Sequence, residues 1–114
     1  MSDVLAFISG AAKAKVEPFE VGGGVVHLRG MTSVHRATFN QLLATAIAEN
    51  SDVPDHVIVA WGVCDQDGKR PDAKPEEILA KLEVLDGQVL KRMATRILEL
   101  SGYTKGAVEA AEKN

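Results

Sequence analysis

The stretch VEPFEVGGGVVHLR, residues 16–29, decides the fold at the N-terminal side of the chain. Two runs of β-favouring residues flank Gly22-Gly23-Gly24. Glycine supplies the positive φ that a tight hairpin turn requires, so the stretch predicts a β-hairpin over 16–29. Pro18 has no backbone N–H to donate, and the first strand is therefore expected at an edge of the sheet.

The residues after the hairpin predict a helix over 33–49. Thr32 and Ser33 can each accept backbone N–H groups as a helix N-cap. Apolar residues then recur at the spacing of one helix face. These residues are Phe39, Leu42, Leu43, Ala46 and Ile47.

Two further helices are predicted in the C-terminal half. Pro75 suits the first position of a helix over 75–85, and the acidic residues that follow it suit the positive end of the helix dipole. Asp86 can cap a second helix over 87–101. Gly102 is a typical helix-ending residue and sets the end of that helix.

The run VIVAWGVC, residues 57–64, has two interpretations. A continuous apolar run of this length fits either a buried strand or a buried helical segment. Its β-branched residues favour a strand. Asp65-Gln-Asp-Gly68 follows it as a strong turn signal, because Asp and Gly both stabilise turns locally.

These elements predict one α+β domain, predominantly helical, with a small N-terminal β-hairpin packed on three to four helices. At 114 residues the chain has the length of a single domain. We expect the domain to span 16–102. Residues 1–15 are expected to form an arm or short helix, and 103–114 a mobile C-terminal tail.

Composition argues against several classes of partner. The formal net charge is −3 and aromatic residues make up 4% of the chain, which disfavours nucleic acid and anionic membrane surfaces as partners. The apolar run near the N-terminus is short and has no Lys or Arg before it, so we expect neither a secretion signal nor a membrane anchor. One cysteine fits a reducing cytoplasm.

The residues that could carry chemistry lack the required spacing. Cys64, His27, His35 and His56 contain no paired motif for zinc and no arrangement of nucleophile and base. The acidic turn has its glycine, Gly68, at the fourth position, whereas a calcium loop needs it at the sixth. We therefore expect no enzyme activity, no metal and no cofactor.

Three sequence phrases and the order of the parts carry a resemblance to a known family. The phrases are Arg29-Gly-Met-Thr32, Val63-Cys-Asp-Gln-Asp-Gly68 and Leu100-Ser-Gly102. From about residue 16 to 102 the chain resembles the tail assembly chaperones of long, non-contractile-tailed bacteriophages and prophages. Gly30 stands where that family more usually has an acidic residue. The family favours a helix before the acidic turn, where this chain is unusually β-branched.

The resemblance implies a non-catalytic function. Such a chaperone binds and solubilises the tape measure protein in the host cytoplasm before tail tube polymerisation, and it is not expected in the mature virion. Many members have a longer, frameshifted form that recruits the major tail tube protein, and this chain would match the short form. A homo-oligomer is expected both from the family and from the unpaired apolar surface of so small a domain.

The client would bind apolar residues of the two helices predicted over 75–85 and 87–101, together with one residue of the helix predicted over 33–49. The same residues could instead form the core. The protein-binding candidates are Phe39, Leu82, Leu85, Val89, Leu90, Met93 and Ile97. The alternative function is a small structural or head–tail completion protein that self-assembles in the virion. An enzyme or small-ligand domain and a nucleic-acid-binding regulator are the remaining classes.

Overall fold

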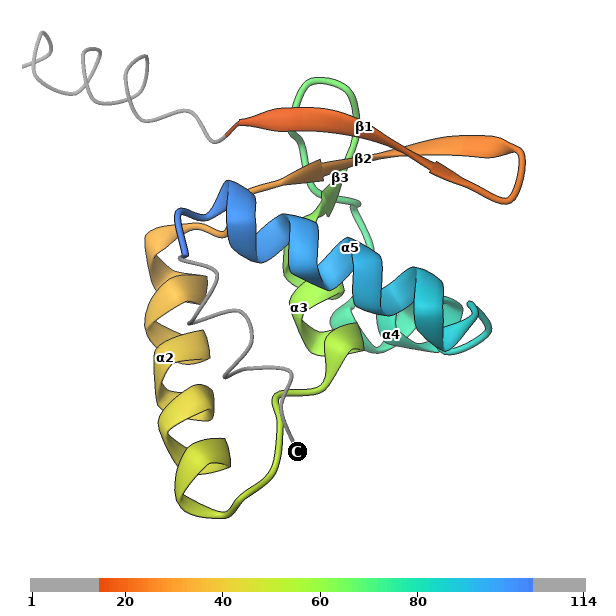
Figure 1. Cartoon of the computed structure of the whole chain (residues 1–114). Coiled ribbons are helices and arrows are strands. Elements are labelled where there is room, and N and C mark those ends of the chain that lie inside the picture. Colours follow the sequence, from red (N-terminus) through yellow and green to blue (C-terminus); the bar gives the residue numbers. More distant parts are fainter. Residues whose placement is uncertain (1–14, 104–114) are drawn as a thin grey trace, which may run out of the picture.

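The N-terminal hairpin forms where the sequence predicts it. In the computed structural model of the protein, which describes residues 15–103, β1 (Val16–Val21) pairs antiparallel with β2 (Gly24–Arg29) (Figure 1). Gly22 and Gly23 have φ values of 53° and 89°. These left-handed conformations are those of a two-residue hairpin turn, which residues with a Cβ adopt reluctantly.

The ambiguous run 57–64 contains both a helix and a strand. Helix α3 (Asp55–Gly62) takes up most of it, and the two-residue strand β3 (Val63–Cys64) follows at once. Strand β3 pairs antiparallel with β2, which gives the sheet order β1-β2-β3. Strand β1 therefore lies at an edge, as Pro18 predicts.

The first long helix, α2 (Ser33–Ala48), begins at the predicted cap. The Oγ1 atom of Thr32 accepts a hydrogen bond from the backbone N–H of His35 over 3.3 Å. The helix ends in a turn at Asn50, whose φ is 55°. The boundaries thus agree with the sequence prediction to within a residue.

The last two helices are α4 (Pro75–Leu82) and α5 (Gly87–Leu100). Asp86 caps α5, because its Oδ1 accepts from the N–H of Gln88 over 2.7 Å. Helix α4 ends before the predicted residue 85, since the N–H of Leu85 bonds back to the carbonyl of Leu82 in a turn that leads into the cap. With α2 and α3 these helices confirm the predicted α+β class within the described residues.

The core lies where α5 packs against α3 and against β2 (Figure 1). Phe39 from α2 also reaches this core. The largest fully buried side chains come from four elements. They are Leu28, Phe39, Ile58, Val59, Met93, Ile97 and Leu98.

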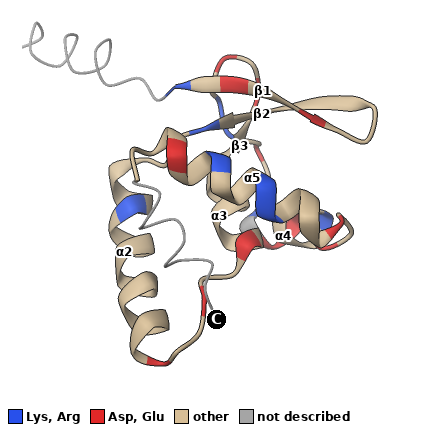
Figure 2. Ribbon diagram, in the orientation of Figure 1, with Lys and Arg blue, Asp and Glu red and all other residues tan. Residues whose placement is uncertain are grey.

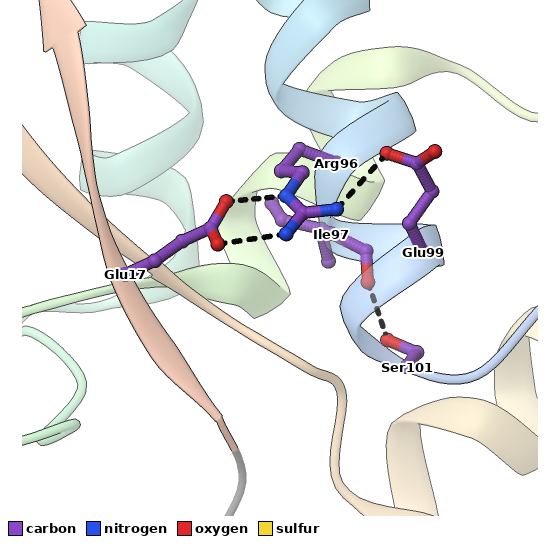
Figure 3. A network of polar contacts seen from close by, with 5 residues as sticks. All are labelled: Glu17, Arg96, Ile97, Glu99 and Ser101. Carbon is purple, nitrogen blue, oxygen red and sulfur yellow. Dashed lines mark hydrogen bonds and ion pairs between the residues drawn. The ribbon is translucent and has the colours of Figure 1, made fainter.

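A close contact joins the link after β2 to the end of α5. A Cβ atom on Gly30 would lie 2.7 Å from the carbonyl oxygen of Leu100, so no side chain fits there. The N–H of Met31 donates to the Oγ of Ser101 over 2.8 Å. This hydroxyl in turn donates to the carbonyl of Ile97 over 2.6 Å (Figure 3). The contact accounts for the glycine at position 30.

An ion pair ties the edge strand to α5. The guanidinium group of Arg96 donates two hydrogen bonds to the carboxylate of Glu17, and a third, longer one of 3.4 Å to Glu99 (Figure 3). The hydrogen bonds from Arg96 hold the pKa of Glu17 below its ordinary value. Both side chains are partly exposed, so the pair is screened by solvent.

We expect Glu17→Gln to lower the free energy of unfolding at pH 7 by at most about 1 kcal/mol, as for other exposed pairs. Because the folded-state pKa of Glu17 lies below its unfolded value of about 4.3, the stabilisation is complete above that value. It is lost as the pH falls through the folded-state pKa. Urea unfolding of wild type and variant between pH 7 and pH 3 measures this. The exposed Glu20 on the same strand provides the control, Glu20→Gln, and a deficit that stays constant down to pH 3 would contradict the assignment.

Candidate protein-binding surface

Helix α2 is covered by the rest of the described chain along a narrow stripe only. Of its 16 residues, only Phe39 and Ala46 are buried. In Figure 1 it extends along one side of the molecule, away from the sheet. Most of its circumference is therefore open to solvent.

The open part of α2 carries almost no charge. Residues 37–48 include no Asp, Glu, Lys or Arg, and along the sequence they are flanked by Arg36 and Glu49. In Figure 2 most of the α2 ribbon is accordingly tan. A surface helix of a globular protein usually has charged and polar residues on the face away from the core. Over residues 37–48 the outer face of α2 has no charged residue, although only Phe39 and Ala46 of the helix are buried.

Two large apolar side chains, Val34 and Leu42, are exposed on one side of that buried stripe. Their exposed fractions are 71% and 39%. At about 100° per residue, Thr38 and Thr45 lie on the same side. The hydroxyl of Thr38 donates to the carbonyl of Val34 over 3.2 Å, so it is already used within the helix. We call Val34, Thr38, Leu42 and Thr45 the open flank of α2.

The apolar face that the sequence predicts for the helix over 33–49 is only partly buried in the structure. Phe39 and Ala46 are buried and Leu43 is partly buried, but Leu42 and Ile47 are exposed. The spacing placed all five on one face, yet only a narrow stripe of the helix meets the core. Leu42 and Ile47 lie on opposite sides of that stripe.

The protein-binding residues predicted from sequence lie mostly inside the protein. Phe39, Leu82, Met93 and Ile97 are at most 7% exposed. Leu85, Val89 and Leu90 are partly buried and pack against the core. The first four thus stabilise the fold and present little surface to a client. The sequence signal that was missed is the absence of charge over 37–48.

His27 and Cys64, which are distant in sequence, are directly opposite each other on β2 and β3. Residues opposite each other in an antiparallel pair project to the same face of the sheet. Burial, however, raises the pKa of the Cys64 thiol. A nucleophilic cysteine requires the reverse, because the thiolate is the reactive form.

The acidic turn after β3 is held by its own carboxylate. The Oδ1 atom of Asp65 accepts hydrogen bonds from the N–H groups of Lys69 and Asp67, each 2.9 Å long, and the first of these is the main cause of the lowered pKa of Asp65. Gly68 has a φ of 84°. Among residues 15–103 there is no group of three or more His, Cys, Asp or Glu side chains that could hold a metal ion.

Aromatic contacts hold the first half of α2 against the body. The ring of His35 stacks on Trp61 of α3 with centroids 5.2 Å apart, and the edge of Tyr103 meets Phe39 at 5.1 Å. Burial is the main cause of the lowered pKa of His35, and the positive charge of the nearby Arg70 lowers this pKa further. Both effects favour the neutral form of the imidazole. These contacts join the N-terminal half of α2 to α3 and to Tyr103.

Comparison with protein-family models, with curated proteins and with solved structures finds no match for this chain. None of the described helices combines the length and the apolar character that a membrane span needs.

Proposed function

We propose that the protein is a phage tail assembly chaperone that binds and solubilises the tape measure protein before tail tube polymerisation. The observation that carries the proposal is the open flank of α2, with Val34 and Leu42 exposed on a helix that has no charged residue over 37–48. The sequence phrases shared with the family supply the identity of the client.

A flank of this kind suits a long helical client. An amphipathic helix can lay its apolar face against an uncharged helix and bury the exposed side chains of both. One contact of this size is weak, so many copies of the chaperone along one client are needed to hold it. Weak contacts also allow each copy to leave as tube subunits add. The chaperone would act in the host cytoplasm and self-associate, with a longer form recruiting the tube protein.

The alternative is a structural or head–tail completion protein of the virion. The same flank would then be buried permanently against a neighbouring subunit in the particle. The two functions differ in where the protein is found, because a chaperone leaves before the tail is complete.

Co-expression with the tape measure protein encoded nearby tests the proposal. We expect the tape measure protein to be soluble only when this chain is present, and the two to co-purify with many copies of the chain per client. Expression of the client alone is the control. Absence of any interaction, together with this chain in finished particles, would favour the structural alternative.

A further inference from the structure

A groove runs between the edge strand β1 and helix α5. It has a volume of about 400 Å³. From β1 it is lined by Glu17 and Phe19, which alternate along the strand and so project to one face of the sheet. Its α5 wall includes Gln88, Lys91, Arg92, Arg96 and Glu99. From Gln88 to Glu99 the helix rises about 17 Å, which is the length of about five residues of extended chain.

The end of the groove beside Glu99 has excess negative charge. Arg96 donates hydrogen bonds across the groove to Glu17 and along α5 to Glu99 (Figure 3). One guanidinium group therefore faces two carboxylates. The pair of Arg96 and Glu17 also joins the two walls at this end. A further anion is disfavoured here, because the neighbouring carboxylates would repel it.

The half of the groove nearer the start of α5 has excess positive charge. Lys91 and Arg92 are exposed, and neither side chain has an ion pair or hydrogen bond with any other of residues 15–103. Together with Arg96 they are the blue segments of α5 in Figure 2. Because the formal net charge of the chain is −3, this surplus of positive charge is local.

Phe19 gives the positive half of the groove an apolar floor. Figure 1 shows β1 running in the direction opposite to α5, so Phe19 lies nearer the start of α5 than Glu17 does. The ring is only partly buried, although it packs against the core. This half of the groove thus combines two unpaired cations with a partly exposed aromatic ring.

We propose that the groove binds an acidic segment of another protein, one in which Asp or Glu stands next to a large apolar residue. The carboxylate lies on Lys91 and Arg92, with which it forms charge-assisted hydrogen bonds. The apolar side chain lies on Phe19 and adds buried area, which is needed because an exposed ion pair contributes little on its own. The segment has no second acidic residue at the end beside Glu17 and Glu99.

A nucleic acid fits the groove less well than such a segment. It carries a phosphate at every nucleotide and binds mainly by having several of these phosphates neutralised. In the groove, Lys91 and Arg92 are followed along α5 by the excess of carboxylates around Arg96. A phosphate backbone that lies on the two cations would meet these carboxylates next.

Fluorescence anisotropy with the full chain and short labelled peptides tests the inference. The probe is an end-capped peptide with the core Glu-Glu-Leu-Phe. Its two controls are Gln-Gln-Leu-Phe, which keeps the apolar part, and Glu-Glu-Ser-Ser, which keeps the charge. We expect saturable binding of the first peptide, and an affinity at least about fivefold lower for each control.

The variant Lys91→Gln/Arg92→Gln assigns the binding to the groove. Both side chains are exposed, so the core is left intact. We expect this variant to bind the acidic peptide at least about fivefold more weakly than the wild type does. The matched control, Lys74→Gln/Lys81→Gln, removes the same charge from exposed positions outside the groove and should bind like the wild type.

Any of three results would overturn the inference. The first is no saturation up to about 1 mM acidic peptide, and the second is equal affinity of the groove variant and its control. The third is tighter binding of a single-stranded oligonucleotide than of the acidic peptide, which would assign the groove to nucleic acid. The groove is formed by β1 and α5, and no measurement involves α2 or the tape measure protein. The inference is therefore independent of the proposed function, and the two can fail separately.

Discussion

Replacing Phe39 with alanine is expected to lower the free energy of unfolding by about 3–5 kcal/mol, the range for large aromatic truncations in a core. Phe39 is fully buried and is one of only two buried residues of α2. Its ring also supports Tyr103. The packing of an apolar stripe supplies most of a helix's stability in a protein, so the loss falls on the whole of α2. Urea unfolding followed by circular dichroism measures the change.

The variant Phe39→Leu separates a core role from a binding role. Leucine keeps an apolar side chain in the site, and hydrophobic replacements near the original volume usually cost less than about 1.5 kcal/mol. We therefore expect this variant to retain most of the stability. If Phe39→Ala were as stable as the wild type and lost only client binding, the binding role predicted from sequence would be correct and the core role wrong.

Gly62→Ala is expected to destabilise the protein by about 1–3 kcal/mol, the usual cost of overpacking. A Cβ atom at this position would lie 2.4 Å from Cδ1 and 2.6 Å from Cγ1 of Ile97, which is fully buried. Helix propensity alone predicts the opposite sign, because alanine is favoured over glycine in a helix by about 0.5–1 kcal/mol. The sign of the change in thermal or urea stability therefore distinguishes the two effects.

A double-mutant cycle assigns the clash to Ile97. Ile97→Val removes Cδ1, the atom nearest to the added methyl group, and should itself cost about 0.5–1.5 kcal/mol. Combined with Gly62→Ala it should cost less than the sum of the single changes, with a coupling of at least about 0.5 kcal/mol. Additive costs would mean that α3 shifts away from α5 as a whole.

The elements that sequence predicts well are those set by local interactions. The paired glycines fix the hairpin turn, Thr32 and Asp86 cap their helices, and Gly102 ends the last one. Each of these turns, caps and helix ends depends on residues that are at most a few positions apart in the chain, so the local sequence is sufficient to predict it.

The run 57–64 could not be assigned because its structure depends on distant residues. Helix α3 needs a residue without a side chain where it meets Ile97, and Gly62 provides it. Strand β3 pairs with the edge of β2 that β1 leaves free, with Val63 opposite Leu28 and Cys64 opposite His27. Neither partner is visible in the hydrophobic pattern of the run itself.

The binding surface was misplaced for a related reason. An apolar residue at helical spacing can face the core or a partner, and the spacing is the same in both cases. Met93 and Ile97 face the core, whereas Leu42 is exposed. Which of them is covered is decided by how the helices are arranged, and only the structure contains that arrangement.

The measurement that tests the central claim most directly is co-expression of the tape measure protein with a chain altered on the open flank of α2. In Val34→Gln/Leu42→Gln, glutamine removes the apolar surface and keeps a good helix former. The matched control is Val84→Gln, which alters a residue that is 84% exposed and lies outside α2. We predict that the flank variant folds but no longer keeps the client soluble, while the control behaves like the wild type. A flank variant that solubilises the client as well as the wild type does would contradict the account.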